Sequence, residues 1–261
     1  MSWRVVAERD ALDPHRSRSG WVYLAVYALL FGLLGYLSAG SVPLGASLAT
    51  VAAYFVPLTA LTAGYQAVVG SRQNGGLRVV LSFPHTRREV VVGTAVGRAV
   101  VIATLVTISF AVAALIRLVT DGVPDLGVLA VAWALSVALG AAVASFSVAL
   151  SASVRTTNRA AVLAFGSFLL FAGLWGQIPT AVRFVLNGFS FPSGPTPEWV
   201  AAFAQLNPTT AFQTALRGLA PGSSLPGGPF YQTAWFALLV LAAWLCVPLA
   251  LGSLRFERSD L

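Results

Sequence analysis

Lysine is absent from this chain of 261 residues, and cysteine and histidine are almost absent. The single cysteine, Cys246, excludes a disulfide bond within the chain and any metal site that needs several thiolates. The two histidines, His15 and His85, lie far apart in the sequence. Because the Gly-rich loop that cradles ATP phosphates requires a lysine, the chain cannot bind ATP through such a loop. Any ATP-driven step would therefore need another subunit.

Charged residues are also scarce, at 10% of the chain, whereas 57% of the residues are hydrophobic and the mean hydropathy is +0.80. A soluble domain carries about 25% charged residues. A disordered chain combines low hydrophobicity with high charge. The composition therefore excludes both classes and predicts a polytopic membrane protein.

Six stretches of the sequence are long and apolar enough to cross a bilayer, which requires about 20 mostly apolar residues. Their approximate bounds are Trp21–Gly40, Ala46–Val69, Ala99–Val119, Gly127–Leu150, Ala160–Trp175 and Thr233–Ser253. None alternates like a barrel strand, so we predict an all-α fold with six transmembrane helices in one domain, residues 1–261. The first stretch follows a charged segment and lacks a convincing cleavage site, so we expect a retained span rather than a signal peptide.

The sixteen arginines indicate how the chain is oriented. If the N-terminus is inside, thirteen of them lie in cytoplasmic segments and only Arg117, Arg183 and Arg217 lie outside. Cytoplasmic loops of membrane proteins carry such an excess, so we expect a cell-membrane protein with both termini in the cytoplasm. The same distribution explains the net charge of +7 better than binding to nucleic acid does.

The predicted spans contain almost no ionisable residues. All nine acidic residues fall in loops or tails: Glu8, Asp10, Asp13, Glu89, Asp121, Asp125, Glu198, Glu257 and Asp260. This placement argues against a carrier coupled to protons or sodium, which needs buried carboxylates. It also argues against an intramembrane hydrolase, because no histidine lies in a span to act as a base. The serines Ser145, Ser147, Ser151 and Ser153 are therefore interpreted as small residues for helix packing.

Two further patterns concern the membrane interface and helix packing. In residues 1–20, Trp3, Val6, Ala7 and Ala11 fall on one helical face, which predicts an amphipathic helix in the cytoplasmic interface. The alternative is a plain charged flank. Gly93 and Gly97 form a Gly-x-x-x-Gly motif, and we favour a packing role within one subunit over a dimer contact.

The segment 176–232 between the last two spans is too long for a structureless loop and contains eight prolines. Helical character is expected over Glu198–Leu206 and Thr209–Leu219, separated by Asn207 and Pro208. Many aromatic residues predict an external helical subdomain close to the membrane interface: Phe184, Phe189, Phe191, Trp199, Phe203 and Phe212.

The cytoplasmic loop 70–90 is the most informative segment. Leu77, Val80 and Leu81 can form a short apolar face, and Pro84 ends this helical run. A second helix is expected near Thr86, with Glu89 in its first turn, where the helix dipole favours an acid. The pattern predicts a short helix that lies along the membrane surface.

With these features in place, the chain resembles the permease subunits of type-2 ABC exporters. Among them is the six-span group that includes the permease of the nitrous-oxide-reductase maturation system. The similarity covers the whole chain. It includes the start of span one, Arg16–Trp21, the loop from Arg72 to Glu89 with Gly93, and Leu206–Ala211 before the last span.

The resemblance implies that loop 70–90 carries a coupling helix, which docks into a groove on an ATP-binding subunit. The implied contact residues are Arg72, Gly75, Leu77, Arg78, Leu81, Pro84 and Arg87. The family pattern has an acid before the first arginine, a Gly-Thr pair and a later lysine. Here those places hold Ser71, Gly75-Gly76 and Thr94. These departures concern the details of docking rather than the architecture.

The resemblance also implies the partners and the source of energy. The chain would pair with a second copy or a paralogue in contact with membrane lipids, and two ATP-binding subunits would bind ATP and magnesium. The chain itself would hold no cofactor and no catalytic residue. The expected function is export of a substrate, and its class stays open among drugs, lipids, polysaccharide precursors and sulfur species. The scarcity of Met, Cys and His argues against direct passage of copper ions.

Two other functions are compatible with parts of the sequence. One is a membrane scaffold or assembly factor that transports nothing. The other is a membrane enzyme that acts on lipid headgroups, for which His85, Arg88 and Glu89 form the only available cluster.

Overall fold

The computed structural model describes residues 3–16, 18–40, 42–76, 86–191, 194–223, 225 and 227–258. These residues form α-helices and short helical turns, and no strand occurs among them. The long helices are α1 (Trp3–Arg16), α2 (Arg18–Leu37), α3 (Leu44–Gly64), α6 (Arg87–Asp121), α7 (Leu126–Ser153), α8 (Thr157–Leu169) and α12 (Ala234–Glu257). The shorter elements are α4 (Val69–Gln73), the π-helical turn η1 (Leu170–Leu174), α9 (Gln177–Leu186), α10 (Glu198–Gln205), α11 (Pro208–Leu219) and η2 (Phe230–Gln232).

Six of the described segments are long and apolar enough to span a membrane, which confirms the predicted number of spans. They are Gly20–Leu37, Leu44–Gln73, Arg87–Asp121, Leu126–Ser153, Thr157–Leu174 and Ala234–Glu257. The expected bounds of two spans were wrong. The third helix begins at Arg87 rather than near Ala99, and the second is broken between Gly64 and Val69.

The early start of α6 has a local cause. Thr86 caps the helix by accepting a hydrogen bond from the Glu89 amide, and the Glu89 carboxylate accepts one from the Thr86 amide. This reciprocal capping box satisfies two donors that a helix start otherwise leaves unpaired. The helix expected near Thr86 is therefore confirmed, but it continues without a break into the third span.

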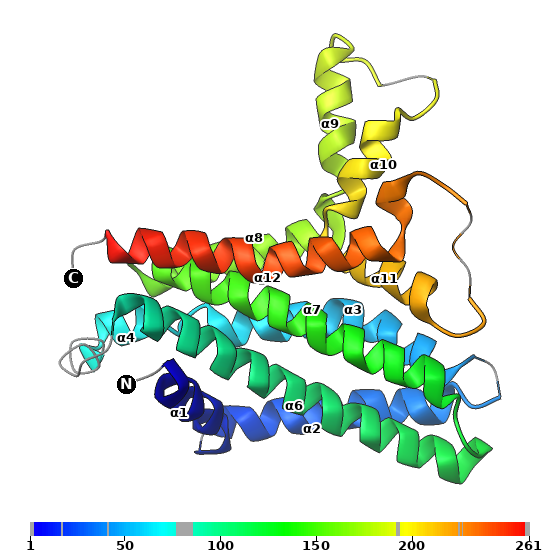
Figure 1. Cartoon of the computed structure of the whole chain (residues 1–261), viewed down its shortest axis with the longest axis horizontal. Helices are drawn as coiled ribbons and strands as arrows, with labels where there is room; N and C mark the ends of the chain where they lie inside the picture. The colour runs from blue at the N-terminus through cyan, green and yellow to red at the C-terminus, as the bar shows by residue number, and fades with distance from the viewer. Residues whose placement is uncertain are drawn as a thin grey trace.

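The spans lie side by side, and the start of α1 and the end of α12 lie at the same end of the bundle as α4 (Figure 1). The turns that join α2 to α3 and α6 to α7 lie at the opposite end (Figure 1). Helices α9 and α10 project away from the bundle after α8, whereas α11 returns to it (Figure 1).

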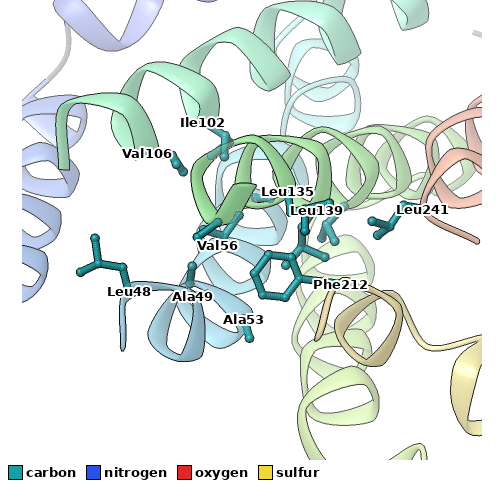
Figure 2. Close-up of a cluster of buried hydrophobic side chains, with 14 of the residues drawn as sticks. Leu48, Ala49, Ala53, Val56, Ile102, Val106, Leu135, Leu139, Phe212 and Leu241 are labelled. Carbon is teal, nitrogen blue, oxygen red and sulfur yellow. The ribbon is translucent and has the colours of Figure 1, made fainter. Parts of the chain in front are cut away.

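The core forms where α3, α6, α7, α11 and α12 meet (Figure 2). Val56, Ile102, Leu139 and Phe212 are fully buried in it. Lipid is as apolar as these side chains, so close packing holds the helices together instead of the exclusion of water. At Gly140, an added Cβ would lie 2.5 Å from the Ile102 side chain, which requires glycine there.

Helix α1 packs directly against the Gly-x-x-x-Gly motif of α6. A Cβ on Gly93 would lie 2.6 Å from the Trp3 carbonyl oxygen, and one on Gly97 would lie 2.7 Å from Asp10 Cβ. The motif therefore serves a contact within the chain, as predicted. Asp10 also forms an ion pair of 3.0 Å with Arg98.

The segment between the last two spans contains both expected helices, as α10 and α11. Asn207 caps α11 and Pro208 occupies its first turn, as the sequence indicates. One expectation for this segment was wrong. Phe212, which was grouped with the interfacial aromatic residues, is fully buried in the core, because α11 turns back into the bundle. Helix α9 was not predicted.

Candidate functional site

The candidate site lies at the end of the bundle that holds both termini, where the loop between α4 and α6 begins and ends (Figure 1). Two serines of α7 fix the approach to this loop. The Ser147 hydroxyl donates to the Leu61 carbonyl at 3.0 Å, near the end of α3. The Ser151 hydroxyl accepts from the amides of Val68 and Val69, each at 3.1 Å, and so caps α4. These contacts confirm the packing interpretation for both serines.

Arg72 lies in α4 and points back toward the bundle. Its guanidinium donates to the Val154 carbonyl at 3.4 Å, and Val154 is the residue that caps the C-terminus of α7. A helix C-terminus leaves carbonyl oxygens unpaired and carries partial negative charge, so a cation is stabilising there. The same guanidinium carbon lies 5.2 Å from the centre of the Phe256 ring.

Arg87 also binds a helix C-terminus, at the other end of the loop. It is the first residue of α6, and its guanidinium donates to the carbonyls of Phe256 and Glu257 at 3.2 and 3.3 Å. These are the last carbonyls of α12, so Arg87 caps a second helix C-terminus. Its guanidinium carbon lies 5.8 Å from the centre of the Phe256 ring.

Both guanidinium groups therefore contact the Phe256 ring. The Phe256 side chain is fully buried. Its neighbours form a small second core, separate from the main one, at this end of the bundle. This core consists of Val68, Val90, Val91, Ala95, Val148, Ala152 and Phe256. It joins the α3–α4 junction to the start of α6 and to the C-terminal ends of α7 and α12.

The structure thus brings two of the seven predicted contact residues, Arg72 and Arg87, onto one aromatic ring. Gly75 follows α4 with a φ of +77°, a left-handed conformation that favours glycine, and a Cβ there would meet nothing within 4 Å. The other four predicted residues lie outside the described part of the chain: Leu77, Arg78, Leu81 and Pro84.

Several residues of this end were missed by the sequence reasoning. Phe256 and Val154 gave no signal, because each is apolar and far in sequence from the arginine that it meets. Thr157 donates to the Gln73 side chain at 2.9 Å, which links α8 to α4. Four exposed arginines close to this site were already among those expected on the cytoplasmic side: Arg88, Arg155, Arg255 and Arg258.

The cluster considered for lipid-headgroup chemistry has a structural explanation in its described part. The Glu89 carboxylate accepts from both the amide and the hydroxyl of Thr86 and so completes the helix cap. His85 lies outside the described residues. Within the described part of the chain, no group of three or more His, Cys, Asp or Glu residues is arranged to hold a metal ion.

One charged residue is buried at the opposite end of the bundle. Arg117 is 7% exposed and donates to the Ser38 hydroxyl and the Val42 carbonyl, each at 3.1 Å. It also pairs with Asp121 at 3.1 Å, and Asp121 accepts from the Gly40 amide. Arg117 therefore holds the turn between α2 and α3 against α6, which is a structural role.

An open apolar cavity of about 610 Å³ lies between α3 and α8. Its lining includes Leu58, Tyr65, Val162, Phe165 and Leu169. The lining offers little for a polar solute to bind, so the cavity suits lipid chains or apolar side chains of another subunit.

Comparisons with known proteins agree with this architecture. Residues 4–261 match the family model described as ABC-2 family transporter protein. The chain is 31% identical, over an alignment 284 positions long, to the probable ABC transporter permease protein NosY of Stutzerimonas stutzeri, with 97% of each chain covered. It is 28% identical, over an alignment 277 positions long, to the protein of the same name from Pseudomonas aeruginosa, again with 97% of each chain covered.

Proposed function

Because the chain belongs to the ABC-2 transporter family and is a multi-pass transmembrane subunit of an ABC transporter, we propose that it is the permease half of an exporter driven from the cytoplasm. The observation that carries this proposal is the anchoring of the loop between α4 and α6. Arg72 and Arg87 fix its two ends to the ends of α7 and α12. A partner that pushes on this loop would act on three spans together.

We assign this loop to the cytoplasmic side and the docking contacts to its residues. The start of α1 and the end of α12 lie at the same end of the bundle as α4 (Figure 1). Most arginines of the sequence belong to the segments expected on the cytoplasmic side. The proposed contacts are Gly75, Leu77, Arg78, Leu81 and Pro84, while Arg72 and Arg87 contribute by holding the loop in place. The exposed arginines around the loop would suit an acidic surface on the partner.

ATP and magnesium belong, in this proposal, to the ATP-binding subunit. The chain contains no lysine, and the phosphate-binding loop of such ATPases depends on one. The chain is therefore a permease without an ATPase site of its own, and its task is mechanical.

A second permease, either another copy or a paralogue, completes the proposed transporter. The bundle core is filled by buried side chains such as Val56, Leu139 and Phe212, so a pathway through the middle of one subunit is blocked. The pathway then lies between two bundles. The apolar cavity between α3 and α8 supports placing the second subunit, or membrane lipid, against that face.

Co-purification and ATPase measurements test this proposal. We expect the chain to co-purify with a soluble ATP-binding subunit and to alter its ATPase rate in lipid vesicles. The substitution Leu77→Asp should weaken this effect without loss of the folded permease, because a charge disrupts apolar docking. The matched control Val123→Asp changes an exposed apolar residue at the opposite end and should leave coupling intact. Coupling that survives changes at both Arg72 and Leu77 would contradict the loop assignment.

A further inference from the structure

We propose that Phe256 is the positioning residue that transmits movement of the α4–α6 loop to the sixth span, α12. The inference rests on the proposed function, in which an ATP-binding subunit moves that loop. It concerns a residue of the last span, far from the loop in sequence, that neither the family pattern nor the arginine count indicates.

The first step of the argument is geometric. The loop leaves α4 just after Arg72 and rejoins the helical bundle at Arg87, and both guanidinium groups lie over the Phe256 ring, at 5.2 and 5.8 Å. Arg87 also binds the Phe256 and Glu257 carbonyls directly. A displacement of either end of the loop therefore acts on the same side chain and on the same helix terminus.

The second step concerns the strength of these contacts. A guanidinium over an aromatic face is attracted more strongly when water is partly excluded. Phe256 is fully buried, and both arginines are only partly exposed. The planar guanidinium stacks on a ring in a way that an aliphatic side chain of similar volume cannot reproduce. The aromatic face, rather than volume alone, is therefore the property by which the Phe256 side chain links the loop to α12, in addition to the Arg87 hydrogen bonds to the main chain.

The third step follows the movement along α12. Helix α12 crosses α7 closely, because a Cβ on Gly252 would lie 2.7 Å from the Ala149 Cα. Farther along, the Trp244 indole donates to the Leu206 carbonyl at 2.8 Å, next to the start of α11. Helix α11 in turn places Phe212 in the main core. A continuous set of packed contacts thus joins the loop to the segment between the last two spans.

A purely structural role for Phe256 makes a different prediction. If the ring only fills the second core, then Phe256→Leu should cost stability but leave coupled movement intact. If the ring transmits movement, Phe256→Leu should weaken the coupling of α12 to the loop, because it leaves only the Arg87 hydrogen bonds to the main chain. Phe256→Tyr should preserve the coupling. The pair of variants therefore separates volume from aromatic stacking.

The experiment measures distances between spin labels in the complete transporter with its ATP-binding subunit, in a Cys246→Ser background. Labels at Gln73→Cys and Leu254→Cys report on α4 and α12, each paired with a reference at Leu29→Cys on α2. All three positions are exposed. Only one permease subunit carries labels, and distances are compared without nucleotide and after trapping with ATP and vanadate.

With Phe256 or Tyr at this position, we expect trapping to shift both distances. With Leu, the Gln73–Leu29 distance should still shift, and the shift in the Leu254–Leu29 distance should be reduced, because only the Arg87 hydrogen bonds to the main chain of α12 remain. An unchanged α12 shift in the Leu variant would overturn the inference. So would a complex with Phe256 in which the loop moves and α12 does not, although the proposed function would then stand. If no ATP-binding subunit associates with the chain, the proposed function fails and the inference fails with it.

Discussion

The side-chain amide of Asn207 donates a hydrogen bond of 2.9 Å to the main-chain carbonyl of Phe171 and so ties the start of α11 to the π-helical turn at the end of the fifth span. The Asn207 side-chain oxygen also accepts from the Thr209 amide at 2.8 Å. In a π-helical turn the main-chain hydrogen bonds span five residues instead of four, and such turns often lie at functional sites. The Asn207 side chain therefore caps α11 and also provides a hydrogen-bond donor for the Phe171 carbonyl of this turn.

We expect Asn207→Ala to lower the free energy of unfolding by about 2 kcal/mol, because it removes a helix cap and a buried hydrogen bond. Thermal unfolding in detergent measures the change. The control is Asn187→Ala, since Asn187 is exposed and its amide contact to the Ser190 carbonyl is long, at 3.4 Å. Equal stability of the two variants would show that the contact with Phe171 contributes little.

The contact between α1 and α6 predicts that Gly97→Ala is destabilising. The new Cβ would lie 2.7 Å from Asp10 Cβ and 2.9 Å from the Ala7 carbonyl oxygen, so α1 must shift. Overpacking of this kind costs roughly 1–3 kcal/mol. Gly166→Ala on α8 is the control, because a Cβ there meets nothing within 4 Å. It should leave the melting temperature unchanged or raise it. The opposite order of the two melting temperatures would refute the close contact.

The buried guanidinium of Arg117 predicts a loss of stability in Arg117→Met of about 2 kcal/mol, since Asp121 then loses its ion-pair partner at the C-terminal end of α6. The loss should be accompanied by faster proteolysis of the turn between α2 and α3, which Arg117 holds through Ser38 and Val42. Arg117→Lys keeps the charge but not the fork that reaches three partners, so an intermediate result is expected. Wild-type stability and proteolysis in the Met variant would contradict this role.

The orientation inferred from the arginines can be tested with single cysteines in a Cys246→Ser background. We expect a membrane-impermeant maleimide added outside intact cells to label Val123→Cys but not Arg155→Cys. Both positions are exposed, and they lie in turns at opposite ends of α7. Labelling should reverse in inside-out vesicles. Outside labelling of Arg155→Cys alone would invert the proposed topology.

Much of the fold could be predicted because bilayer thickness imposes a minimum length on each apolar helix. The number of spans, the in-chain role of Gly93 and Gly97, and the start of α11 at Asn207-Pro208 all follow from local patterns. Thr86 and Glu89 predict the helix start correctly, but the sequence pattern predicts a helix separate from the third span. No breaker separates that cap from the third span, so the helix continues.

What the sequence could not supply is the set of contacts between distant residues. Arg87 meets Phe256 across 169 positions, and Phe256 looks like any other apolar residue of its span. The return of α11 into the bundle could not be predicted for a similar reason. An aromatic residue such as Phe212 suits the core and the membrane interface equally well. The docking role predicted for Arg72 rests on resemblance alone, whereas its contact with the end of α7 comes from the structure.

Cross-linking from the loop tests the central claim, docking of an ATP-binding subunit at this end, most directly. The probe is Asn74→Cys in a Cys246→Ser background, because Asn74 is exposed directly after α4. With a bifunctional maleimide, this cysteine should capture the ATP-binding subunit of the assembled transporter, and Val123→Cys at the opposite end should not. Capture of that subunit from Val123→Cys, with none from Asn74→Cys, would contradict the account.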